Sequence, residues 1–237
     1  MRFLTVLVSV VLICVMSISA NAKKEDKEDK RIEAKVWFKD GRVYQGEMPK
    51  HWLTYGQTFL ASGHNFHILS DQGKNVKCQV KDVDSILIVS SSHEKFVPGD
   101  FYLPAEKFSA YKKTKLVRRI KQGRYVDFCK MPYIGNCQVA GMQMDQRMEY
   151  WLVRFSNDGK TYFFFDNPLN KGCHKPKFYV GAFYNSIKKS YPDLAEAVMA
   201  RFDSDDKKER KAIAQDIAEN PEIFVDFVDQ YLIEHSR

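Results

Sequence analysis

Between residues 32 and 91 the apolar positions of the chain recur with a period of two, which is typical of β-strands. Ala34, Val36 and Phe38 form one apolar row, and Asp40-Gly41, a favoured two-residue hairpin turn, follows it. Further extended segments are predicted at residues 43–48, 59–60, 65–69, 76–80 and 85–89. Because about five short strands cannot leave one sheet face bare, we expect residues 32–91 to form a small β-barrel.

A polar stretch, residues 92–100, contains Pro98-Gly99 and predicts a linker. The rest of the chain, residues 101–237, is then expected to form a second domain. Gln122-Gly123 and Asn157-Asp158-Gly159 each lie between extended segments. These turn signals predict two antiparallel hairpins at the start of the second domain.

After Pro176 the hydrophobic period lengthens to about 3.6 residues, as in amphipathic helices. Phe183 and Ile187 begin this pattern, and the last helix is marked by apolar residues at Phe224, Phe227, Val228 and Tyr231. Strands followed by helices predict an α+β fold. The expected architecture is an N-terminal small β-barrel, then antiparallel strands, then C-terminal helices.

Two short motifs in the predicted barrel carry a family resemblance. KDGRVYQGEM at residues 39–48 and KDVDSI at residues 81–86 resemble the turns and strands of Sm-like and SH3-like small barrels. The whole chain is similar to uncharacterised exported bacterial proteins in which such a barrel precedes strands and C-terminal helices. The resemblance implies this fold and no established activity. Sm-like proteins bind RNA, but their nucleotide-contacting signatures are not evident here, so we do not transfer that role.

The first 22 residues have the three parts of a secretory signal peptide. Arg2 supplies the positive charge, an apolar run follows, and Ala20-Asn21-Ala22 has the small residues that signal peptidase accepts. Residues 23–31 contain only charged side chains and predict a solvated tether. We expect export to the periplasm, the cell envelope or the extracellular space. No later apolar run approaches the roughly 20 residues that span a bilayer, so no transmembrane segment is expected in the mature chain.

The charge of the chain is unevenly distributed. The formal net charge is +7, but residues 23–190 hold 30 Lys and Arg against 18 Asp and Glu, whereas residues 191–237 hold 6 against 12. This asymmetry fits an anionic partner, docking of the acidic end on the basic part, or two solvated surfaces without a partner. The basic residues most concentrated in sequence, and our candidates for binding an anionic ligand, are Lys112, Lys113, Lys115, Arg118 and Arg119. Export makes nucleic acid an improbable partner.

Four cysteines remain in the predicted mature chain: Cys78, Cys129, Cys137 and Cys173. Export to an oxidising compartment favours disulfides, and four cysteines allow three complete pairings. We favour a Cys129–Cys137 bridge, because Pro132 and Gly135 between them are residues that allow the chain to turn back. No Cys-x-x-Cys pair is present, so we predict neither a structural metal nor a cofactor.

No convincing catalytic motif is present. Ser186 and Lys189 match Ser-x-x-Lys, but the companion motifs of penicillin-recognising enzymes are missing. Aromatic residues crowd the hairpin from Tyr150 to Phe165 and must face both sides of it. If one side is core, the rings on the other side either pack under the C-terminal helices, which we favour, or stack on sugar rings or receive a partner. The sequence favours an exported, noncatalytic binding or interaction protein of the cell envelope. Its ligand is unknown, and the candidates are a polyanion, an anionic or other glycan, and an envelope protein. The alternative is an envelope hydrolase whose site assembles only in space.

Overall fold

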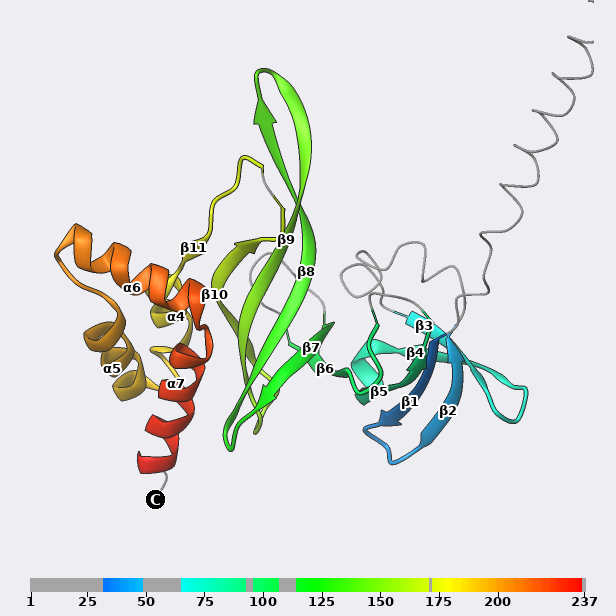
Figure 1. Cartoon of the computed structure of the whole chain (residues 1–237). Coiled ribbons are helices and arrows are strands. Elements are labelled where there is room, and N and C mark those ends of the chain that lie inside the picture. Colours follow the sequence, from blue (N-terminus) through cyan, green and yellow to red (C-terminus); the bar gives the residue numbers. More distant parts are fainter. Residues whose placement is uncertain (1–31, 49–64, 93–95, 107–113, 171, 236–237) are drawn as a thin grey trace, which may run out of the picture.

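The computed structural model describes residues 32–48, 65–92, 96–106, 114–170 and 172–235. The predicted signal peptide (1–22) and tether (23–31) lie outside the described residues, as does the short strand predicted at 59–60. Within the described part, a run of antiparallel strands is followed by four α-helices, which lie to one side of the sheet (Figure 1).

The strands that the structure describes pair in one antiparallel sheet, in the order β11-β10-β9-β8-β7-β6-β5-β1-β2-β3-β4. A single 3-10 turn, Val80–Asp82, separates β4 from β5. The strands are β1 (Ile32–Phe38), β2 (Val43–Met48), β3 (Asn65–Ser70), β4 (Asn75–Gln79), β5 (Val83–Ser91), β6 (Phe101–Ala105), β7 (Lys115–Gln122), β8 (Val126–Val139), β9 (Met142–Phe155), β10 (Thr161–Pro168) and β11 (Lys177–Phe178).

The predicted α+β fold with a separate N-terminal small β-barrel is wrong. β1 to β5 form where strands were expected, and Gly41 makes the β1–β2 turn with a φ of 87°. However, β5 also pairs with β6, through Ile86 with Tyr102 and Leu87 with Phe101, so the N-terminal strands continue into the large sheet. The alternation of apolar residues predicts a strand and the side chains on each of its faces. It does not predict which other strand pairs with the edge of that strand, because this pairing depends on contacts between distant parts of the chain.

The N-terminal strands enclose the first of three cores. Its members alternate along the strands, as the period of two predicts, and include Val36, Phe66 and Ile88. Phe96, from the segment predicted to be a linker, is buried in the same core, where its ring lies 6.4 Å from that of Tyr102.

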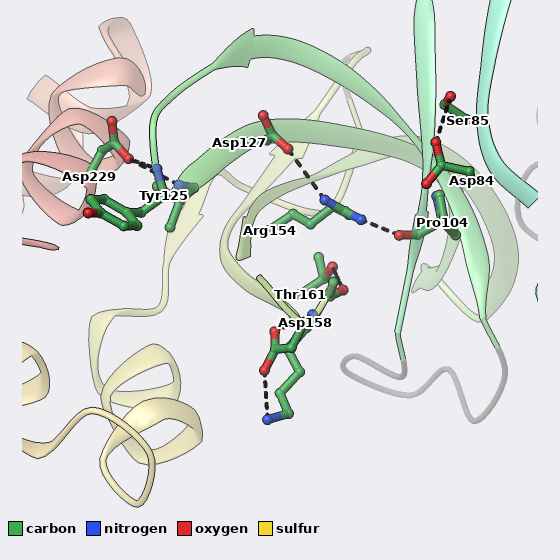
Figure 2. Close-up of polar contacts among 12 residues, drawn as sticks. Asp84, Ser85, Pro104, Tyr125, Asp127, Arg154, Asp158, Thr161 and Asp229 are labelled. Carbon is green, nitrogen blue, oxygen red and sulfur yellow. Dashed lines mark hydrogen bonds and ion pairs between the residues drawn. The ribbon is translucent and has the colours of Figure 1, made fainter. Parts of the chain in front are cut away.

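Strands β6 to β10 curl so that the end of β6 meets the β9–β10 turn. The backbone N–H of Glu106 donates to the carbonyl oxygen of Gly159 (3.3 Å). Arg154 Nε donates to the carbonyl oxygen of Pro104 (2.9 Å), and the Arg154 guanidinium also lies 3.4 Å from the Asp127 carboxylate (Figure 2). The inner side of this curl holds the second core, which consists of Leu103, Ala105, Val117, Cys129, Met131 and Leu152.

The helices of the described part cover the opposite face of β8 to β10 and bury the third core. Phe128, Phe155 and Phe164 come from the sheet, and the ring of Phe224 stacks on that of Phe164 at 4.6 Å. The expectation that helices cover one side of the aromatic hairpin is therefore confirmed. The helices are α4 (Val180–Ile187), α5 (Pro192–Phe202), α6 (Lys207–Glu219) and α7 (Glu222–His235).

The acidic helix α7 docks on the turn between β7 and β8. The carboxylate of Asp229 accepts hydrogen bonds from the backbone N–H groups of Arg124 (2.9 Å), Tyr125 (2.7 Å) and Val126 (3.0 Å) (Figure 2). Gly123 is required there, because a Cβ at this position would lie 2.7 Å from the Asp229 carboxylate. Nearby, Lys121 Nζ lies 2.7 Å from the carboxylate of Glu222. Part of the charge asymmetry of the chain is thus used for internal docking.

The predicted Cys129–Cys137 disulfide is also wrong. β8 runs unbroken from Val126 to Val139, so both cysteines lie in one extended strand, eight residues and roughly 27 Å apart. Disulfides join residues whose Cα atoms lie within about 7 Å. Cys129 is a free, fully buried thiol, and burial raises its pKa.

Candidate functional site

The basic cluster predicted from the sequence is only partly described. Lys112 and Lys113 lie outside the described residues, and Lys115 is 5% exposed. Arg118 lies 3.4 Å from the Asp100 carboxylate, and the guanidinium carbon of Arg119 lies 4.1 Å from the ring centroid of Phe101. The described members are therefore engaged within the chain, and anion binding by this cluster stays a prediction.

Partly exposed aromatic rings gather instead on the face of β8 to β11 that lies opposite the helices. Tyr133 and Tyr150 stack with a centroid distance of 4.1 Å and an interplanar angle of 8°. Phe163 lies 5.8 Å from Tyr150, and Tyr179 lies 5.1 Å from Phe163. The four rings are partly exposed and come from β8, β9, β10 and the residue after β11. They form a continuous strip across neighbouring strands.

Two charged residues lie on the same face as these rings. In the strand register Asp166 is opposite both Tyr150 of β9 and Lys177 of β11, so their side chains share one side of the sheet. Lys177 Nζ also lies 4.7 Å from the ring centroid of Tyr179. We call this group the aromatic face, and its members are Tyr133, Tyr150, Phe163, Tyr179, Asp166 and Lys177.

The carboxylate of Asp166 has an unusual environment for a surface strand. Burial raises its pKa, and the hydroxyl of Tyr133, which donates to both carboxylate oxygens (2.7 and 2.8 Å), opposes that shift together with the nearby His174 and Lys177. Burial and the hydrogen bond to Asp166 likewise raise the pKa of Tyr133. Perturbed titratable groups beside partly exposed aromatic rings are typical of ligand sites.

The loop between β10 and β11 is held against the aromatic face by one buried side chain. Gln146 is 2% exposed, its amide N–H₂ donates to the carbonyl oxygens of Asn170 (2.9 Å) and His174 (3.3 Å), and its oxygen accepts from the backbone N–H of His174 (2.7 Å). These contacts place His174 beside Asp166. These hydrogen bonds therefore fix the loop between β10 and β11 to strand β9.

Most of the aromatic face could not be identified from the sequence. Tyr150 and Phe163 belong to the aromatic hairpin that the sequence highlights, but a register shift between Phe163 and Phe165 interrupts the alternation of β10. Because of this irregularity Phe164 and Phe165 both pack under the helices, and Asp166 falls on the aromatic face. Strict alternation would have placed Phe165 there. Asp166 and Lys177 had no sequence signal of their own.

Apolar hollows also lie on the helical side of the described residues. One, of about 380 Å³, lies between α5 and α7 and is lined by residues that include Phe202, Phe227 and Tyr231. Another, of about 210 Å³, includes Tyr125 and Tyr191. Neither hollow is lined by a buried polar group with a shifted pKa, whereas the aromatic face contains Asp166, so the aromatic face is the stronger candidate site.

Comparisons with known proteins give no relative. No protein-family model matches the chain, and neither a curated protein nor a solved structure matches it. Within the described residues, no helix has the length and apolar character needed to cross a membrane. The same part of the chain holds no group of three or more His, Cys, Asp or Glu side chains arranged to bind a metal ion.

Proposed function

We propose that this chain is an exported, noncatalytic binding protein that holds a carbohydrate on the aromatic face. The observation that carries the proposal is the strip of partly exposed rings, from Tyr133 to Tyr179, beside the charged residues Asp166 and Lys177. An aromatic ring offers a flat apolar surface to the C–H face of a sugar, and charged groups at its border hydrogen-bond the sugar hydroxyls. A strip of rings along several strands suits an oligosaccharide better than a single sugar.

A hydrolase at the same site has less support. Glycoside hydrolysis usually needs two carboxyl groups about 5–9.5 Å apart, one of which has a raised pKa. Asp166 has the raised pKa, but the groups that act on it are Tyr133, His174 and Lys177, and none of these is a second carboxyl group. The binding role therefore fits the described residues better than the catalytic role.

The test is binding of oligosaccharides to the mature chain (residues 23–237), measured by isothermal titration calorimetry. Chitotetraose and cellotetraose represent neutral glycans, and a heparin tetrasaccharide represents polyanions. We expect binding of a neutral oligosaccharide that changes little with salt, because stacking and neutral hydrogen bonds are not screened as exposed charges are. Binding confined to heparin and lost at high salt would favour the basic cluster instead.

The matched variants are Tyr150→Ala on the aromatic face and Tyr184→Ala on α4. Truncation of an aromatic anchor typically weakens binding by about tenfold or more, so Tyr150→Ala should do so. Tyr184 lies on the helical side, where its hydroxyl donates to Glu196 (2.8 Å), and its removal should leave affinity unchanged. Equal affinities for the two variants, with both folded, would rule out the aromatic face. Release of reducing sugar during the titration would support the hydrolase.

A further inference from the structure

The imidazole ring of His174 has a buried nitrogen atom, Nε2, that forms no hydrogen bond within the described residues. The backbone N–H and C=O of His174 are both hydrogen-bonded to the Gln146 side chain, which fixes the backbone at this position. Buried polar atoms are nearly always satisfied in native proteins, and an exception points to a bound water or ion.

Gly135 shows what lies next to this nitrogen. A Cβ at Gly135 would lie 3.2 Å from His174 Nε2 and 3.0 Å from Cγ of Met148, so these two atoms are no more than about 6 Å apart. The sulfur of Met148 is bonded directly to that Cγ. The imidazole nitrogen and the Met148 side chain therefore border the same position, and the absence of a side chain at Gly135 leaves a gap between them.

A second thioether lies on the same face of β9. In the β8–β9 register Gly135 is opposite Gln146, so Met148 and Met144 flank Gln146 on one side of the sheet, each about 7 Å from it along the strand. Met148 is 1% exposed, whereas Met144 is 46% exposed. The Met144 side chain is unbranched, and rotation about its three side-chain bonds could turn its sulfur towards Met148.

We propose that His174, Met148 and Met144 bind one soft monovalent cation, Cu(I). Thioether sulfur is a soft ligand that selects Cu(I), and imidazole suits copper equally well. None of the three side chains need carry a negative charge, which fits a singly charged ion. Hard ions such as Mg²⁺ and Ca²⁺ prefer several oxygen ligands, and these three side chains offer none. The site lies beside the aromatic face, but it does not depend on carbohydrate binding.

The experiment uses the folded mature chain with its methionine methyl groups labelled with ¹³C. Ag(I), which has the charge and softness of Cu(I) and is stable in air, is titrated and followed by NMR. Cu(I) affinity is then measured by competition with a chromogenic Cu(I) chelator. We expect one equivalent of Ag(I) to shift the methyl signals of Met144 and Met148. The signal of Met142, which is 66% exposed and lies nearer the hairpin tip, should not move. This readout also separates the site from binding at the buried thiols of Cys78 and Cys129.

Two variants and one control complete the test. Mutation of a residue that hydrogen-bonds to a metal ligand weakens metal affinity by roughly 10–100-fold. Replacing a ligand itself should weaken it at least as much, so His174→Gln and Met144→Leu should each weaken Cu(I) binding by at least about tenfold. Met144 is exposed, so Met144→Leu keeps the proposal testable even when His174→Gln unfolds the chain. Met142→Leu should bind as the parent does. The proposal would be overturned if Met142→Leu weakened Cu(I) binding as much as the other two variants, or if folded His174→Gln bound Cu(I) as the parent does. In that case a bound water molecule would be the partner of His174 Nε2.

Discussion

Both faces of β8 to β10 carry aromatic rings, but the helices bury those on one face and leave those on the other partly exposed. Phe155 and Phe164 are at most 1% exposed under α4 to α7, whereas Tyr133 and Tyr150 keep part of their surface in solvent. Rings under the helices stabilise the fold by burying apolar area. Rings on the aromatic face contribute less to stability, and their open surface is available to a ligand. The comparison separates residues that hold the fold from residues that we propose to bind a ligand.

The largest expected effect on stability belongs to the helical face. Phe224 is fully buried and contacts rings from both the sheet and the helices. Phe224→Ala should lower the free energy of unfolding by about 3–5 kcal/mol, as for other buried aromatic residues. Tyr150→Ala should cost only about 1 kcal/mol, because its ring is partly exposed. Urea denaturation measures both, and equal losses would remove the distinction between the two faces.

The next effect concerns the cysteines. Cys78 and Cys129 are free and buried, which leaves Cys137 and Cys173 as the remaining pair in residues 23–237. Along β8 Cys137 follows Gly135 by two residues, and the ring of His174, next to Cys173 in sequence, packs against Gly135. We predict a Cys137–Cys173 bridge in protein secreted into an oxidising compartment, where it ties the loop to β8.

Reduction of this bridge should lower the free energy of unfolding by about 2–4 kcal/mol, which is typical of a native disulfide. Nonreducing peptide mapping identifies the bridged pair directly. Alkylation before and after unfolding is the control, because Cys78 and Cys129 are buried and should react only after unfolding. Alkylation of Cys173 in the native, oxidised protein would contradict the prediction.

A third prediction tests how the helical layer is attached. Asp229→Asn removes the negative charge of the carboxylate that accepts hydrogen bonds from three backbone N–H groups at the β7–β8 turn. Hydrogen bonds to a charged group contribute about 1.5–3 kcal/mol each. We expect a loss of about 2–3 kcal/mol, since the amide oxygen retains part of this bonding. Asp226→Asn, which breaks only the exposed pair with Lys121, should cost about 1 kcal/mol or less. Equal costs in chemical denaturation would mean that Asp229 does not anchor α7.

The sequence was most informative where local chemistry decides the structure. Asp40-Gly41 and the turn ending at Gly159 made hairpins as predicted, with positive φ at both glycines, and the apolar stripe through Phe224 made a buried helix face. These features depend on a few neighbouring residues and on hydrophobic period.

Features set by distant contacts were not predictable from the sequence. Pro132 suggested a turn, yet β8 continues through it. Its ladder with β7 ends at Lys130, so beyond that point β8 pairs only with β9, and proline is tolerated along an unpaired strand edge. The irregularity that turns Asp166 towards the aromatic face is likewise a property of strand pairing. Most of the candidate site therefore became visible only in three dimensions.

The smallest expected effect is the dependence of stability on pH at the aromatic face. Burial raises the pKa of Asp166 in the folded chain, while Tyr133, His174 and Lys177 oppose the shift. A carboxyl group with a raised pKa stabilises the fold below its ordinary pKa, and this contribution is lost as pH rises through the raised value. Unfolding of the parent and of Asp166→Asn should therefore be compared from about pH 4 to about pH 8. The parent should lose stability relative to the variant as pH rises, and a constant difference would contradict the shift.

The central claim, that the aromatic face binds a carbohydrate, is tested most directly by locating the bound ligand on the folded protein. The mature chain, with ¹³C-labelled tyrosine rings, is titrated with chitotetraose and cellotetraose and followed by NMR. We predict that the signals of Tyr133, Tyr150 and Tyr179 shift together and saturate at one equivalent, while that of Tyr231 in the hollow between α5 and α7 stays in place. Shifts centred on Tyr231, or no shift at any tyrosine, would contradict the account.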